Sequence, residues 1–311
     1  MSLPSESYLV GLIGSGITAS LTPPLHEREA DRQGLRYLYR PVDLDVVGRP
    51  GADVGDLLRA GRDLGFNAFN ITHPCKQLVI AHLDELSPAA RRLDAVNTVL
   101  VRDGRLVGDN TDYSGFAWGL RTGLPGAALG TVVQLGAGGA GGAVAYALLD
   151  AGVRTLRISD VAADRAAERA RTLAALFPDR TVEAIAPADV PAALRAADGL
   201  VNATPIGMHH HPSLPLDADA VHGGLWVADV IYRPVETALL RLAAARGCRV
   251  LDGGHMAVGQ AVDAFRLITG AEADVAAMRA DFLALVAAET GTTTAAPAAT
   301  AATATAAGAG R

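Results

Sequence analysis

TVVQLGAGGAG, residues 131–141, is the stretch that decides the fold of this chain. Its first five residues form a continuous apolar run, the pattern of a strand buried in a parallel sheet. A G-x-G-x-x-G pattern follows at Gly136, Gly138 and Gly141, and an alanine-rich segment typical of a helix covers residues 142–149. Glycines between a strand and a helix let the backbone approach a pyrophosphate at the helix N-terminus. The stretch therefore predicts the first βα unit of a dinucleotide-binding sheet.

The next predicted strand, residues 154–159, ends at an acidic residue. This residue, Asp160, lies nineteen positions after Gly141. A carboxylate here accepts hydrogen bonds from the adenosine ribose and repels the 2′-phosphate of NADP. The sequence therefore predicts NAD as the cofactor, while Arg165 lies near enough to keep NADP as an alternative.

Strands and helices continue to alternate after this unit. Strands are predicted at 182–185, 199–204, 225–231 and 249–252, and helices at 191–197 and 235–246. Such alternation produces a parallel sheet with helices on both faces, so we expect a Rossmann-type doubly wound sheet in an NAD-binding domain over residues 114–254. The triplet 209–211 is three histidines without a carboxylate or cysteine at ligand spacing, which indicates an exposed loop and no metal site.

The first 113 residues predict a second α/β unit, so the fold class is α/β with two domains. Strands are expected at 8–14, 36–43 and 66–71, helices from Pro23 or Pro24 to about Gln33 and over 53–64, and a hairpin with its turn at Asp103-Gly104. Helices expected at 257–269 and 273–288 follow the last sheet strand. We predict that they return to the first unit, giving a discontinuous substrate-binding and catalytic domain of residues 1–113 plus 255–289. Residues 290–311 are rich in Ala and Thr with no apolar period, which indicates a disordered tail.

Lys76 is the only lysine; the other 26 of the 27 basic side chains are arginines. Arginine is always charged, whereas an ammonium group can lose its proton, so a position that keeps Lys is a candidate for proton transfer. Pro74 is well placed to begin a helix that carries Lys76 in its first turn. A cation there opposes the helix dipole, which argues against a purely structural choice. The alternative is a lone lysine retained by chance on a helix surface.

Three other polar side chains precede or begin predicted helices. Ser20 and Thr22 lie just ahead of one helix, and Asp112 lies at the start of another. Hydroxyl groups at such positions cap free backbone amides or, together with those amides, bind an anion. Helix capping is the alternative role for all three residues.

Composition excludes several classes of function. The net charge of -6, without basic runs or an aromatic patch, argues against binding to nucleic acid or to an anionic membrane surface. Cys75 and Cys248 are too few and too far apart for a disulfide framework or a CxxC metal site. The first residues show no basic segment followed by an apolar run, so we expect no signal peptide, and no apolar stretch of about 18 residues occurs. We therefore expect a cytoplasmic protein that acts on a small molecule, with a homo-oligomer possible.

Several motifs occur in a fixed order. They are Ser20-x-Thr22-Pro23, Asn70-Ile71-Thr72-His73-Pro74-x-Lys76, Ala95-Val96-Asn97-Thr98, Asn110-Thr111-Asp112, the glycine loop, Asn202-Ala203-Thr204-Pro205-x-Gly207-Met208 and Gln260-Ala261. With them the chain resembles the shikimate dehydrogenase family over about residues 8–288. Asp160 and Thr22 are similar to the NAD-using quinate/shikimate branch of that family. One departure is Asp94, where the family usually has glycine, and it puts the local turn in question.

The resemblance implies a role for each matching position. Ser20 and Thr22 would hold the substrate carboxylate, Thr72 and Gln260 would bind ring hydroxyls and the carboxylate side, and Asn97 and Asp112 would flank Lys76 at the hydroxyl that is oxidised. The implied cofactor positions are Gly136, Gly138, Gly139, Ala140, Gly141, Asp160, Arg165, Asn202, Thr204, Met208, Val230 and Gly253, with Gly138 to Ala140 at the pyrophosphate and Asn202 to Met208 on the nicotinamide side.

The activity implied is the NAD-dependent oxidation of quinate or shikimate, with Lys76 as general base and Asp112 orienting it. An NADP-dependent biosynthetic shikimate dehydrogenase is the first alternative. The second is a non-catalytic sensor that binds a dinucleotide and a cyclic hydroxy acid.

Overall fold

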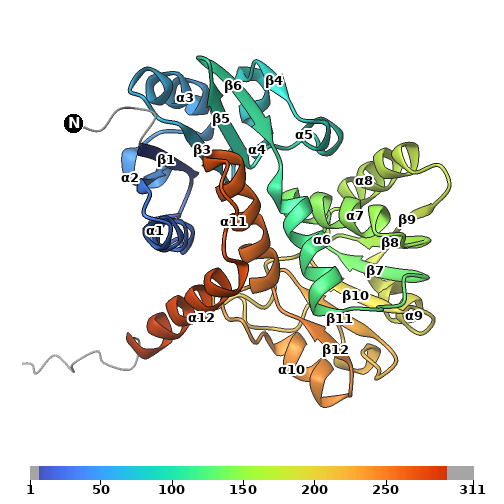
Figure 1. The fold of residues 1–311 in the computed structure, drawn as a ribbon. Coiled ribbons are helices and arrows are strands. Elements are labelled where there is room, and N and C mark those ends of the chain that lie inside the picture. The colour runs from blue at the N-terminus through green and yellow to red at the C-terminus, as the bar shows by residue number, and fades with distance from the viewer. Residues whose placement is uncertain (1–6, 293–311) are drawn as a thin grey trace, which may run out of the picture.

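Two six-stranded sheets organise the computed structural model, which describes residues 7–292 (Figure 1). Each sheet has helices packed on it, and two long helices pass between the sheets. This arrangement confirms the predicted α/β class with a Rossmann-type sheet.

The second sheet is parallel throughout, with the strand order β12-β11-β10-β7-β8-β9. Its strands are β7 (Thr131–Leu135), β8 (Thr155–Ser159), β9 (Thr181–Ile185), β10 (Gly199–Asn202), β11 (Trp226–Asp229) and β12 (Arg249–Leu251). Its helices are α7 (Gly139–Asp150), α8 (Ala163–Leu176), α9 (Val190–Leu194) and α10 (Ala238–Ala245). The order reverses beside β7, so the crevice at the carboxyl ends of β7 and β10 is the expected ligand position.

The first sheet is mixed, with the order β2-β1-β3-β5-β6-β4. Its strands are β1 (Ser7–Gly14), β2 (Arg36–Asp43), β3 (Ala68–Ile71), β4 (Glu85–Leu86), β5 (Thr98–Arg102) and β6 (Arg105–Asp109). Its helices are α1 (Thr22–Arg32), α2 (Leu44–Val47), α3 (Val54–Asp63), α4 (Cys75–Leu78) and α5 (Pro88–Leu93). The predicted hairpin turn is present. Asp103 and Gly104 have φ angles of 50° and 75°, as required by a two-residue turn that matches the right-handed twist of the flanking strands.

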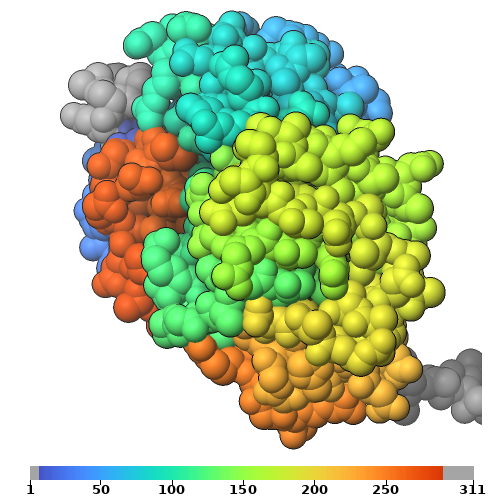
Figure 2. Space-filling model, turned by 90° about the vertical axis from the view of Figure 1, so that its right-hand side faces the viewer, coloured from blue at the N-terminus to red at the C-terminus, as the bar shows by residue number. Residues whose placement is uncertain are grey.

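Helices α6 (Thr111–Gly123) and α11 (Gly254–Thr269) connect the two sheets and pack closely against each other. Glycine permits this approach, because a Cβ on Gly115 would lie 2.5 Å from the backbone nitrogen of Gln260. The far part of α11 joins the core of the first sheet, where Phe265 stacks on Tyr37. Figure 2 shows the orange-red C-terminal helices beside the N-terminal residues, and α12 (Val275–Thr292) also packs on α1. The domain boundaries predicted above remain a prediction.

Several helix boundaries differ from the expected ones, among them α7, which begins at Gly139, and α10, which begins at Ala238. Helix α1 begins at Thr22, and α11 begins at Gly254 instead of residue 257, because the Asp252 carboxylate accepts from the Gly254 N–H at 2.9 Å. Helix α12 continues to Thr292, into the segment predicted to be a tail; residues 293–311 lie outside the described residues. Within residues 7–292, no helix has both the length and the apolar character needed to cross a bilayer.

Candidate active site

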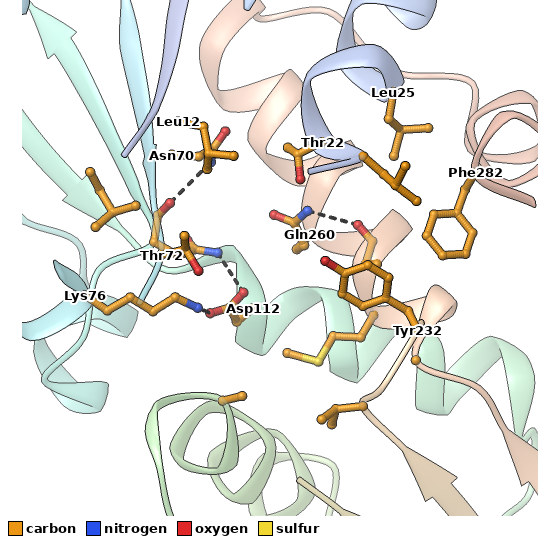
Figure 3. A pocket seen from close by; sticks show the side chains of 18 residues that line it. Leu12, Thr22, Leu25, Asn70, Thr72, Lys76, Asp112, Tyr232, Gln260 and Phe282 are labelled. Atoms are coloured by element: carbon orange, nitrogen blue, oxygen red, sulfur yellow. Dashed lines mark hydrogen bonds and ion pairs between the residues drawn. The ribbon is translucent and has the colours of Figure 1, made fainter. Parts of the chain in front are cut away.

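Lys76 and Asp112 form an ion pair beside the first sheet, where strands β3 and β6 end. Lys76 lies on α4, directly after β3, and its Nζ donates to Asp112 Oδ2 at 2.5 Å (Figure 3). Asp112 lies in the first turn of α6, where the positive end of the helix dipole favours a carboxylate. Asn110, whose side chain accepts from the N–H groups of Asp112 and Tyr113, is the N-cap of that helix. The alternative role of Asp112 as a cap is therefore wrong, and its carboxylate is left for Lys76.

A cavity of about 220 Å³ opens beside this pair. Thr22, Thr72 and Gln260 line it together with Lys76, and they face it from α1, the β3–α4 loop and α11 (Figure 3). Asn70, Asn97, Asp112 and Tyr232 add further polar atoms to its lining. The apolar lining residues include Leu12, Leu21, Leu25, Ile71, Val230, Met256, Ala257 and Phe282. An apolar cavity with a few convergent polar groups is the usual form of a small-molecule site.

A second cavity, of about 680 Å³, lies along the glycine loop. Gly138, Gly139 and Arg165 line it, and Thr72, Lys76 and Ala140 line both cavities. The Lys76 amine therefore stands where a ligand on the glycine loop would meet a ligand in the smaller cavity.

The glycines of the loop divide into two kinds. Gly136 has a φ angle of 95°, and a Cβ on Gly141 would lie 2.4 Å from the Gly136 carbonyl oxygen, so these two glycines are required by the turn itself. A Cβ on Gly138 or Gly139 would have no neighbour within 4 Å in the described part of the chain, which leaves the backbone open to the cavity. Among residues 7–292, no side chain caps the N-terminus of α7 at Gly138. The loop and helix end thus fit the pyrophosphate of a dinucleotide.

Asp160 is buried and forms more hydrogen bonds within the protein than the sequence indicated. Its carboxylate accepts from the N–H groups of Ala137 and Ala162 at 2.8 and 2.9 Å and from Arg165 at 2.6 Å, and its side chain is only 4% exposed. Burial acts to raise the pKa of Asp160, but these donors, Arg165 first, hold it below its usual value. Arg165 is 53% exposed, so this edge of the cavity presents a cation paired with a buried anion, not a bare carboxylate.

The remaining predicted cofactor residues do not all reach a cavity. Val230 and Gly253 line the smaller one, where a Cβ on Gly253 would lie 2.3 Å from the Val230 carbonyl oxygen. Asn202 is fully buried; its amide donates to Asp229 and Ile206 and accepts from Thr204, so it builds the turn that follows β10. Met208 is exposed on the surface, and neither it nor Thr204 is among the described residues that line the two cavities.

Two predicted substrate residues are also held by their neighbours. The Asn97 amide donates both hydrogens within the protein, to Thr111 Oγ1 at 3.0 Å and to Asp112 Oδ1 at 2.9 Å. Asn97 lines the cavity, but in this arrangement it acts on Asp112, and its direct contact with a substrate stays a prediction. Ser20 Oγ accepts from the Thr22 N–H at 3.3 Å, a local contact at the start of α1.

The turn that Asp94 put in question is made without glycine. Asp94 ends α5 with a φ angle of 49°, in the left-handed region that favours glycine and that Asp tolerates. The segment that follows therefore still brings Asn97 to the cavity.

Tyr232, Met256 and Phe282 line the substrate-sized cavity but were missed by sequence reasoning. Tyr232 follows β11, and its place after a sheet strand was a usable signal. Phe282 lies on α12 and contacts the Tyr232 ring edge-on, with centroids 6.0 Å apart. Nothing in the sequence pattern distinguished Phe282 from the other apolar residues of its helix.

Comparisons with known proteins agree with this geometry. Residues 12–99 match the family described as the shikimate dehydrogenase substrate binding domain. The chain is 63% identical to an NADP(+) shikimate dehydrogenase of Pseudarthrobacter chlorophenolicus, over 93% of this chain and 99% of the relative. It is 50% identical to an NAD(+) quinate/shikimate dehydrogenase of Corynebacterium efficiens, over 90% and 99%.

The same family appears among solved structures. Quinate dehydrogenase from Corynebacterium glutamicum in complex with NAD superposes with a TM-score of 0.85 at 46% identity, covering 89% of this chain and 99% of that one. The matched length of about nine-tenths of this chain includes both sheets. The chain belongs to the shikimate dehydrogenase family.

Proposed function

We propose that this protein catalyses the reversible oxidation of the C3 hydroxyl of quinate and/or shikimate to 3-dehydroquinate or 3-dehydroshikimate, with NAD as the hydride acceptor. The observation that carries the proposal is the Lys76 amine, which lies where the two cavities meet and pairs with Asp112 at 2.5 Å.

Lys76 would act as the general base. A secondary alcohol can lose hydride only as its hydroxyl proton leaves, so a base must lie within hydrogen-bonding reach of that hydroxyl. Asp112 holds the amine from one side, and the cavity is open on the other. Bound NAD would supply the nicotinamide that accepts the hydride.

The rest of the smaller cavity would orient the substrate. Thr22 stands at the N-terminus of α1, where backbone N–H groups favour an anion, and Ser20 braces that turn. Thr72 and Gln260 would bind ring hydroxyls or the carboxylate side, since both line the cavity. The apolar walls exclude water from the reacting centre.

NAD is proposed because Asp160 directly follows β8, the position from which a carboxylate accepts from the adenosine ribose and disfavours a 2′-phosphate. The exposed Arg165 favours NADP as the second candidate, because a guanidinium released from Asp160 would pair with that phosphate. Relatives with both cofactor names support each side. We further propose that residues 1–113 plus 255–289 bind the substrate and that residues 114–254 bind the cofactor.

The test is to measure steady-state rates for quinate and for shikimate with NAD and with NADP. The absorbance of the reduced nicotinamide monitors each reaction. Turnover with NAD at a kcat/KM at least about tenfold that with NADP is expected, a difference of about 1.4 kcal/mol in transition-state stabilisation. A reversed ratio would assign the biosynthetic NADP activity. Binding of both ligands without turnover would identify a sensor.

A further inference from the structure

A chain of buried hydrogen bonds leads from β2 of the first sheet to the Asp112 carboxylate. Tyr39 Oη donates to Asn70 Oδ1, and Asn70 Nδ2 donates to Thr98 Oγ1 at 3.0 Å. Thr98 Oγ1 donates to Asn97 Oδ1 at 3.0 Å, and Asn97 Nδ2 donates to Asp112 Oδ1 at 2.9 Å. The other carboxylate oxygen accepts from the amine of the proposed base.

The direction of this chain is fixed at both ends. The Thr111 backbone N–H donates to Asn97 Oδ1 at 2.7 Å, and a backbone donor cannot reverse, so the amide must present its oxygen to Thr98 and its NH₂ group to Asp112. At the far end, burial raises the pKa of Tyr39 well above its usual value, which keeps its hydroxyl a donor. Every donor therefore points toward the Asp112 carboxylate.

Packing alone does not require these hydroxyls. Thr98 is 0% exposed on β5 and Tyr39 is 3% exposed on β2. A valine would match the shape of Thr98 without a polar group to desolvate, and it suits a strand equally well. The buried Thr98 hydroxyl instead accepts from the Asn70 amide and donates to the Asn97 amide, so it can fix the orientation of one amide relative to the other.

We propose that Thr98 and Tyr39 are positioning residues for the oxidation step. Their hydroxyls act through Asn97 to hold the Asp112 carboxylate, and with it the Lys76 amine, in the orientation that receives the substrate proton. This inference rests on the proposed function, because it assigns the chain of hydrogen bonds to the same reaction.

The test compares Thr98→Val with Thr98→Ser. The valine variant should lose about tenfold or more in kcat, equivalent to about 1.4 kcal/mol, while KM for the substrate stays within about twofold. The serine variant keeps the hydroxyl and should recover most of kcat. Tyr39→Phe, which removes only the hydroxyl oxygen, should lower kcat about two- to threefold, because Tyr39 lies two hydrogen bonds further from the Asp112 carboxylate than Thr98 does.

Val99→Ala is the matched control. Val99 follows Thr98 on β5, is fully buried, and projects from the opposite face of the sheet. It should lower the melting temperature without lowering kcat. Should Thr98→Val fail to fold, Tyr39→Phe carries the test.

Three results would overturn the inference: a Thr98→Val enzyme with parental kcat, a Thr98→Ser enzyme as impaired as the valine variant, or an equal loss in Val99→Ala. Where Thr98→Val does not fold, parental kcat in Tyr39→Phe would overturn it. Failure of the proposed function looks different, because the parent protein itself would then turn over none of the four substrate and cofactor pairs.

Discussion

His26 makes the stability of the protein depend on pH in a way that one substitution should remove. The ring lies on α1 with 0% exposure, between Tyr37, Tyr39 and Phe265. Its Nδ1 lies 3.1 Å from the Tyr37 hydroxyl. Burial lowers the pKa of His26 to about 3, because a charged imidazole would lose its hydration there.

The size and sign of the effect follow from this pKa. In the unfolded chain a histidine titrates near pH 6.5, so between that pH and about 3 the unfolded state binds a proton that the folded state does not. The contribution of His26 to stability is fully present above about pH 6.5 and falls by about 1.4 kcal/mol per pH unit as the solution becomes more acidic. From about pH 7.5 to about pH 5 the loss is about 2 kcal/mol.

The assay is urea unfolding followed by tryptophan fluorescence at these two pH values, for the parent and for His26→Leu. The leucine variant should be less stable at the higher pH, because the Tyr37 hydroxyl loses its neighbour, but its stability should fall by about 2 kcal/mol less on acidification. His209→Gln, a change at an exposed histidine, is the control and should behave as the parent does. An equal fall in the parent and in His26→Leu would refute the reasoning.

Three further predictions concern the proposed site. Lys76→Arg should lower kcat by a factor of about 10² to 10⁴ with substrate affinity nearly unchanged, because arginine keeps the charge but does not give up its proton. Steady-state kinetics and a substrate-binding titration check this prediction. A variant with near-parental turnover would exclude Lys76 as the base. Asp160→Asn should raise the NADP-to-NAD ratio of kcat/KM by about tenfold or more, because it removes the charge that holds Arg165; the same ratio in variant and parent, with an unchanged melting temperature, would contradict it. Gly141→Ala should raise KM for the cofactor by at least about tenfold, because the Cβ of the new alanine would collide with the Gly136 carbonyl and displace the loop. Cofactor titrations at saturating substrate measure this KM, and an unchanged value would contradict the prediction.

Local patterns in the sequence were enough to predict several parts of the fold. The apolar run at 131–135 followed by the glycine pattern predicted β7 and its turn, and these form as expected. Asp103-Gly104 predicted the hairpin between β5 and β6 for the same reason, since both depend on backbone angles that few residues adopt. The sequence also singled out Lys76 and Asp112, through residue type and position beside a predicted helix start.

Only the tertiary structure decided which of those residues meet. Lys76 and Asp112 are 36 positions apart and join because β3 and β6 lie in one sheet and end at the same cavity. Folding also places the Asp160 carboxylate against two backbone N–H groups and Arg165, partners that the sequence did not indicate, while its contact with the ribose stays a prediction. A single sequence specifies which groups can donate or accept, but the packing of separate segments determines which partner each buried group finds, because most buried polar groups form their hydrogen bonds within the folded chain.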